Sequence, residues 1–114
     1  MKDWTPIRER FMRDDLPVRL GGLAANLGRI KSFSRNEANR NVVEDLIEES
    51  KYFIEWTASE AEIETAAKLV ELQRELVRWQ FKMEQFWPDS MQRKQLAEKS
   101  SAWSQQVLES SGVI

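Results

Sequence analysis

The side chains that could do chemistry in this chain are carboxylates, amines, hydroxyls and a single tyrosine, because the sequence contains neither histidine nor cysteine. Without histidine, a general base would have to be a carboxylate or a lysine with a strongly shifted pKa. Without cysteine there is no thiolate nucleophile, disulfide or thiolate-bound zinc. No nucleophile-elbow, Ser-x-x-Lys or phosphate-loop signature is present. The sequence therefore predicts a protein that is not an enzyme and holds no cofactor.

Carboxylates alone can bind a hard cation such as Ca²⁺, Mg²⁺ or Mn²⁺, but their spacing here does not favour such a site. Metal sites in helical bundles combine inward-facing glutamates with histidines, and the ligand order of the EF-hand is absent. Glu44, Glu48 and Glu55 fall opposite the apolar residues of their predicted helix, where charges are usually solvated. A small-ligand or carboxylate-only metal-binding bundle is therefore the weakest of three functional hypotheses.

Arginine side chains concentrate towards the N-terminus, which suits the binding of phosphate or another anion. Residues 1–40 carry nine basic and five acidic side chains, residues 41–75 three and ten, and residues 76–114 five and four. We expect the basic first part and the acidic middle to pack side by side. The second hypothesis is a surface patch for an anionic partner such as nucleic acid, formed by Arg8, Arg10, Arg13, Arg19, Arg29 and Arg35. The interleaved acidic residues argue against nucleic acid.

Apolar residues recur at steps of three and four through most of the chain, which indicates amphipathic helices. Prolines and three capping boxes, which begin at Ser34, Ser59 and Asp89, mark the breaks between helices. The predicted helices cover residues 6–14, residues 16 to the box at Ser34, the segment from there to about 56, residues 60–87, and the segment after Asp89 to about 110. The sequence predicts an all-α fold, a four-helix antiparallel bundle with a short extra N-terminal helix, in a single domain of residues 1–114.

A strip of small residues lies on one face of the second predicted helix and consists of Gly21, Ala24, Ala25 and Gly28. Each glycine costs a helix about 1 kcal/mol relative to alanine. We therefore expect a tight contact with another helix that offsets this loss. A ligand groove lined by backbone is the alternative.

The helix predicted over residues 60–87 carries two apolar stripes, which is more than a helix on the surface of a bundle needs. The first stripe has heptad steps and consists of Leu69, Leu72, Leu76, Trp79, Met83 and Phe86. The second stripe consists of Ile63, Ala67, Val70, Val77 and Phe81. Gln73 and Gln80 lie between the stripes, and we expect them to be satisfied polar positions between two helices. The helix is predicted to be either central in the bundle or shared with another subunit.

The favoured hypothesis for function is protein–protein interaction, and a symmetric homodimer is the expected assembly. The candidate interface is the second stripe, represented by Ile63, Val70, Val77 and Phe81. The rival expectation is that the short N-terminal helix and the last helix cover this stripe within one chain.

Two further expectations come from signals that the sequence lacks. The first residues have no apolar segment or cleavage site of a signal peptide, and no stretch approaches the roughly 20 apolar residues of a membrane span. We therefore expect a cytoplasmic protein without a membrane partner. The general pattern resembles that of many small helical proteins of bacteria, although no motif ties it to one family. Gly112 is expected to end the last helix and to leave Val113 and Ile114 as a short apolar tail.

Overall fold

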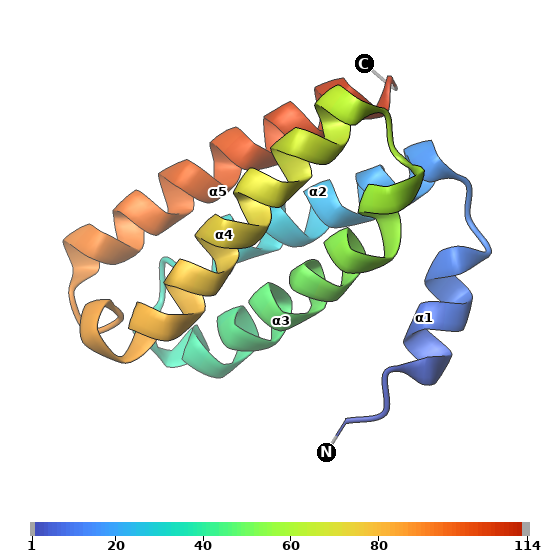
Figure 1. Ribbon diagram of the computed structural model, residues 1–114. Coiled ribbons are helices and arrows are strands. Elements are labelled where there is room, and N and C mark those ends of the chain that lie inside the picture. Colours follow the sequence, from blue (N-terminus) through green and yellow to red (C-terminus); the bar gives the residue numbers. More distant parts are fainter. Residues whose placement is uncertain (1, 113–114) are drawn as a thin grey trace.

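The computed structural model describes residues 2–112, and in this part of the chain every regular element is a helix (Figure 1). The elements are α1 (Thr5–Met12), α2 (Leu16–Phe33), the 3-10 helix η1 (Glu37–Asn39), α3 (Arg40–Thr57), the 3-10 helix η2 (Ala58–Glu60), α4 (Ile63–Phe86) and α5 (Ser90–Ser111). The prediction of an all-α bundle with a short N-terminal helix is confirmed. Within residues 2–112 no helix combines the length and apolarity that a membrane span requires.

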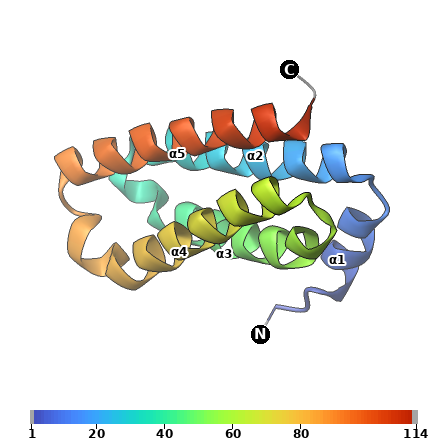
Figure 2. The same ribbon diagram turned by 45° about the horizontal axis from the view of Figure 1, so that its top comes forward.

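Helices α2 to α5 run alternately in opposite directions (Figure 1). Helix α2 makes the most extensive contacts of the four. It packs most extensively on α5 and next on α3, whereas α4 packs on α3 and more sparsely on α5. Figure 2 shows the resulting layers, with α2 and α5 side by side above α3 and α4. Helix α1 lies at one end of the bundle and contacts α3. The alternative that the helix over residues 60–87 is central is therefore wrong, because α4 packs on its neighbours less extensively than the other three long helices do.

The core is formed by the inward faces of all four long helices. The first heptad stripe of α4 is entirely buried, as predicted. It meets buried apolar residues of the other helices, among them Leu23, Leu27, Ile30, Val43, Ile47, Leu96 and Val107. At about 25 cal/mol per Å² of buried apolar surface, this shared core is the main source of stability.

Small residues and serine hydroxyls let α5 approach the backbone of α2. The Ser100 hydroxyl donates to the Leu27 carbonyl at 2.6 Å, and the Ser104 hydroxyl donates to the Ala24 carbonyl at 2.8 Å. A carbonyl with two lone pairs can accept these bonds in addition to its helix bond. The tight contact expected of the small strip thus involves Ala24, while a Cβ atom added at Gly21 or Gly28 would have no neighbour within 4 Å.

Two of the three predicted capping boxes are wrong, and the clearest case is Ser34. This residue ends α2, and its buried hydroxyl donates to the Ile30 carbonyl at 2.6 Å. Serine at the end of a helix can satisfy a carbonyl four residues back instead of capping the next helix. Asn36 caps η1 instead, and α3 begins only at Arg40.

The starts of α4 and α5 agree only in part with the predicted capping boxes. Ser59 lies within η2, and α4 follows Glu62, which makes no side-chain cap. The third start is confirmed in part. Asp89 caps α5, because its carboxylate accepts from the backbone N–H of Met91 at 2.9 Å. The side-chain amide of Gln92 donates to the same carboxylate at 3.2 Å, whereas the Asp89 N–H donates to the Phe86 carbonyl, so the reciprocal bond of a capping box is not formed. Gly112 ends α5 with a left-handed φ of 77°, as expected of a glycine at this position. The predicted apolar tail at Val113 and Ile114 lies outside the described residues.

Candidate functional site

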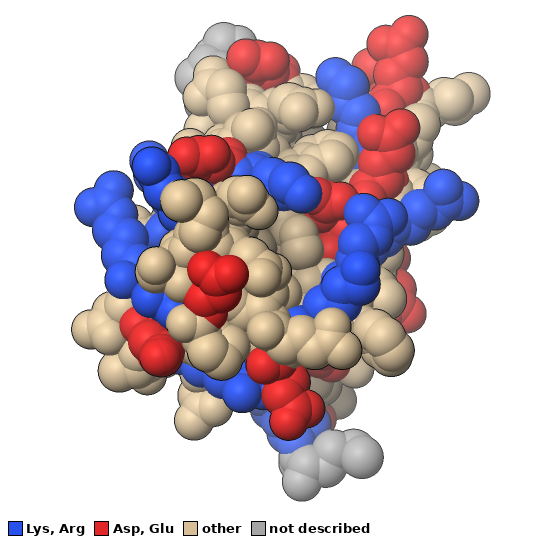
Figure 3. Space-filling view, turned by 90° about the vertical axis from the view of Figure 1, so that its left-hand side faces the viewer, with Lys and Arg blue, Asp and Glu red and all other residues tan. Residues whose placement is uncertain are grey.

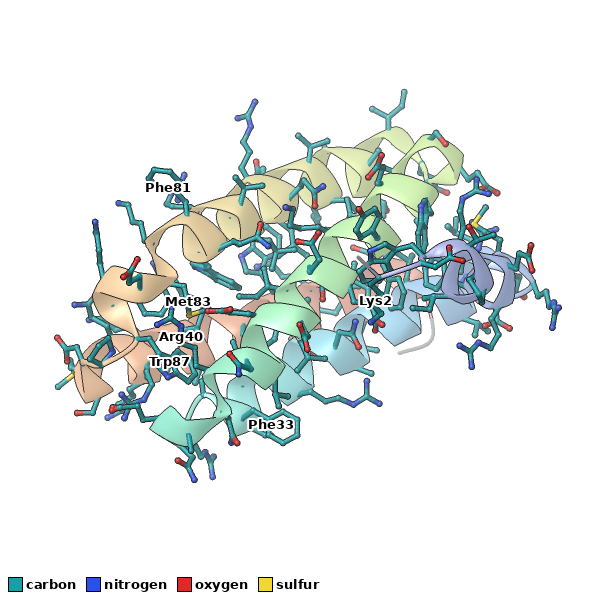
Figure 4. The ribbon with its side chains drawn as sticks, turned by 90° about the horizontal axis from the view of Figure 1, so that it is seen from below. Lys2, Phe33, Arg40, Phe81, Met83 and Trp87 are labelled. Atoms are coloured by element: carbon teal, nitrogen blue, oxygen red, sulfur yellow. The ribbon has the colours of Figure 1, made fainter. Side chains whose placement is uncertain are left out.

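The outward face of α4 carries the second apolar stripe, and no helix of residues 2–112 covers it. Ile63 is 89% exposed, Phe81 85%, Val70 47% and Val77 46%. Figure 4 shows Phe81 pointing away from the bundle, whereas Met83 on the same helix points inward. The expectation that the first and last helices cover this stripe is wrong, because α1 packs on α3 and α5 packs mainly on α2.

The exposed residues follow a second heptad pattern along α4. Steps of four and three residues connect Ile63, Ala67, Val70, Arg74, Val77 and Phe81, and all six are exposed. We call this set the outer seam. Alternating steps of this kind are typical of the contact line between two coiled-coil helices. Arg74 was missing from the predicted interface because it is charged, although the spacing alone would have included it.

The edge of α4 that faces α3 is already occupied by polar contacts. Gln80 accepts from the Lys51 amine at 2.7 Å and donates to the Glu48 carboxylate at 2.6 Å. Gln73 donates to the Lys51 carbonyl at 3.4 Å. The expectation that both glutamines are satisfied polar positions between two helices is confirmed for Gln80. Gln73 also lies between α3 and α4, but its buried Oε1 has no hydrogen-bond partner among the described residues. The other edge of the outer seam, with Glu64, Glu71 and Arg78, faces solvent.

A second feature is a cavity of about 580 Å³ between the end of α2 and the first turns of α5. Four cationic side chains line it, namely Lys31, Arg35, Arg93 and Lys94, together with the single carboxylate of Glu98. Figure 3 shows this end of the molecule, where Lys and Arg side chains lie around the edge with carboxylates between them. Only Arg35 of this group belongs to the predicted anionic-partner patch. The cavity brings together two segments that are about 60 residues apart in the chain.

Contacts with Trp87 hold one of these cations in place. Arg93 donates to the Trp87 carbonyl at 2.7 Å, and its guanidinium lies 5.7 Å from the centre of the indole ring. The Trp87 side chain is buried and donates to the Glu37 carbonyl at 2.7 Å. These bonds connect the α4–α5 turn to η1, so the position of Arg93 is fixed by the fold and not by a surface rotamer.

The arginines predicted as one anionic-partner patch do not lie together. Arg8, Arg10 and Arg13 lie in α1 or directly after it, at one end of the bundle, whereas Arg35 follows α2 at the opposite end (Figure 1). Arg29 lies along α2 and donates to the side chain of Asn26 at 3.0 Å. A single surface for nucleic acid is therefore not formed by these residues within one chain.

Arg19, the sixth member of that set, points into the protein. Its side chain is 8% exposed, and its two terminal nitrogens donate to the Glu60 carboxylate at 2.9 and 3.1 Å. The Glu60 carboxylate raises the pKa of Arg19, and Arg19 lowers the pKa of Glu60. This ion pair joins the basic first part of the chain to the acidic middle, as the charge distribution predicted.

Aromatic stacking attaches α1 to α3. Trp4 stacks on Tyr52 with 4.4 Å between ring centroids, and Phe11 stacks on Phe53 at 4.1 Å. The amine of Lys2, labelled in Figure 4, lies 4.6 Å from the centre of the Trp4 ring. The aromatic residues of α3 that flank the core thus pack against α1 and the residue before it.

The described residues contain no group of three or more acidic side chains arranged to hold a metal ion. Comparison with models of protein families, with curated proteins and with solved structures gave no significant match. Fold and site geometry define a small all-α bundle with the exposed outer seam on α4 and a cationic cavity at one end.

Proposed function

We propose that this protein acts through self-association, as an antiparallel homodimer in which α4 packs on α4 of a second copy. The observation that carries the proposal is the exposure of the outer seam. Two large apolar side chains, Ile63 and Phe81, are more than four-fifths exposed, and the residues between them keep heptad spacing. Large apolar side chains that gather on one exposed face, here interrupted by Arg74, are characteristic of interaction sites.

The order of residues along the outer seam suits an antiparallel partner. In an antiparallel pair, each a position of one helix faces a d position of the other. With the two-fold axis between Val70 and Arg74, Ile63 faces the partner's Phe81 and Ala67 faces the partner's Val77. The layers therefore repeat identically on both sides of the axis, as an isologous interface requires.

Charge also favours the antiparallel arrangement. Glu64 then lies beside the partner's Arg78, and symmetry gives this pair twice. Near the axis the two Arg74 guanidiniums lie next to the two Glu71 carboxylates and offset their mutual repulsion. In a parallel pair, Arg74 would instead face the partner's Arg74, which is unfavourable.

The length of the outer seam limits the affinity. At 1.5 Å per residue, the distance from Ile63 to Phe81 is about 27 Å. A single pair of helices of this length gives an interface at the lower end of the usual size range. We therefore expect a dissociation constant in the micromolar range and a dimer that forms at high protein concentration.

The test is the molar mass in solution, measured by light scattering and by sedimentation over a wide range of concentration. The wild type should shift from monomer to dimer, and the double variant Val77→Glu with Phe81→Glu should stay monomeric with unchanged helix content and melting temperature. The matched control is Val18→Glu with Met91→Glu, which alters exposed apolar residues on α2 and α5. It should dimerise like the wild type.

Two results would contradict the proposal. One is a wild type that remains monomeric at millimolar concentration. The other is unfolding of the Val77→Glu and Phe81→Glu variant, which would mean that the outer seam belongs to the core of a single chain.

A further inference from the structure

We propose that the cationic cavity between α2 and α5 binds a small phosphorylated molecule that also carries hydroxyl groups, such as a sugar phosphate. The cavity lies at the end of the bundle and shares no residue with the outer seam. The inference is therefore independent of the proposed dimer.

The charge of the cavity is opposite to that of the whole chain. Four cations and one carboxylate line it, while the protein has a net charge of −2. Lys31, Arg35 and Lys94 take part in none of the ion pairs or side-chain hydrogen bonds formed among residues 2–112. Four cations beside a single carboxylate repel one another, so a bound anion would relieve this repulsion. Phosphate is the anion that such a Lys and Arg cluster suits best.

The volume of the cavity and its other lining residues indicate which class of ligand it can hold. A volume of about 580 Å³ lies within the range of pockets for small organic molecules and exceeds the volume of a phosphate ion alone. The hydroxyls of Ser90 and Ser101 can donate to phosphate oxygens, and the Glu98 carboxylate can accept from a hydroxyl of the ligand. The described lining residues include no aromatic ring on which a nucleobase would stack.

The position of the cations is partly fixed before a ligand binds. Arg93 is held by the Trp87 carbonyl and ring, and Trp87 is in turn bonded to Glu37. Ser90 is the first residue of α5, so the helix fixes the place of its hydroxyl at the edge of the cavity. Preorganised groups lose less conformational freedom on binding, so the fixed position of Arg93 should raise the affinity of the cavity.

The experiment is calorimetric titration of the full chain with glucose 6-phosphate and, separately, with inorganic pyrophosphate at low salt. We expect saturable binding of one molecule per chain. The double variant Lys31→Gln with Lys94→Gln should weaken binding by about a hundredfold, since each lost charge-assisted hydrogen bond corresponds to about tenfold. The matched control Arg8→Gln with Arg13→Gln removes the same charge from the far end of the molecule and should bind within about twofold of the wild type.

A second measurement keeps the inference testable if the variants alter the fold. Amide chemical shifts of the wild type, followed during the glucose 6-phosphate titration, should move around Lys31 and in residues 90–101. The proposal is overturned by absence of saturable binding, by equal loss in both double variants, or by shifts spread over the whole surface. Tighter binding of a single-stranded oligonucleotide, lost in the Lys31→Gln and Lys94→Gln variant, would also overturn it in favour of nucleic acid.

Discussion

At the scale of single residues, the ion pair between Arg19 and Glu60 connects two distant parts of the chain. It closes the α3–α4 connection onto the start of α2, and Arg19 also donates from its Nε to the Asp14 carbonyl at 2.9 Å. A guanidinium that is nearly out of contact with water requires such partners, because leaving it unpaired is costly. The sequence indicated that opposite charges would meet but not which two residues would form the pair.

The pKa of Glu60 makes this contribution pH-dependent. Because Arg19 holds the pKa of folded Glu60 below its usual range, the pair stabilises the protein above the pKa of Glu60 in the unfolded chain. The stabilisation is lost as the pH falls through the lower, folded pKa. We expect Glu60→Gln to melt at a lower temperature than the wild type at pH 7, with the difference disappearing in acid. The control Glu55→Gln should melt like the wild type throughout, and a constant gap for Glu60→Gln at all pH values would refute this account.

At the scale of helices, the pair α2 and α5 shows packing that depends on small side chains. Ser100 is fully buried against α2, and its hydroxyl bonds the Leu27 carbonyl. The amphipathic pattern of α5 is weak in the sequence, since its buried face includes serines besides Leu96 and Val107. The sequence of the last helix therefore shows only a thin apolar stripe. Nevertheless, the contact between α5 and α2 is the most extensive one between any two helices.

Enlarging the buried serine should force α5 away from α2. We expect Ser100→Leu to lower the free energy of unfolding by about 1–3 kcal/mol, as overpacking typically does. Ala102→Leu, at an exposed position of the same helix, is the matched control and should change stability little. Urea denaturation followed by circular dichroism measures both, and equal stability of the two variants would show that α5 is loosely packed.

At the scale of the whole molecule, α1 is the element least integrated into the bundle. Its described contacts with α3 rest on aromatic stacking, chiefly Phe11 on Phe53 and Trp4 on Tyr52. Elements with few buried contacts open at lower free energy than the core.

Loss of the Phe11 ring should therefore release α1 without unfolding the other helices. In Phe11→Ala we expect the amides of α1 to exchange hydrogen almost as fast as in an unfolded chain, while α2 to α5 stay protected. Hydrogen exchange read by mass spectrometry of peptides provides the measurement, with Ile7→Ala as a milder comparison. Uniform loss of protection in all helices would mean that α1 is part of the cooperative core.

The sequence by itself determined the helices and the buried face of α4, because the spacing of apolar residues fixes which side of a helix avoids water. It did not determine how extensively each helix would pack on the others, since periodicity describes one helix and not its neighbours. Only the tertiary structure shows that the outer seam is uncovered, because α1 packs on α3 and α5 packs mainly on α2. It also decided that Lys31 and Arg35 meet Arg93 and Lys94 at one cavity, a proximity that arises only when α5 folds back antiparallel along α2.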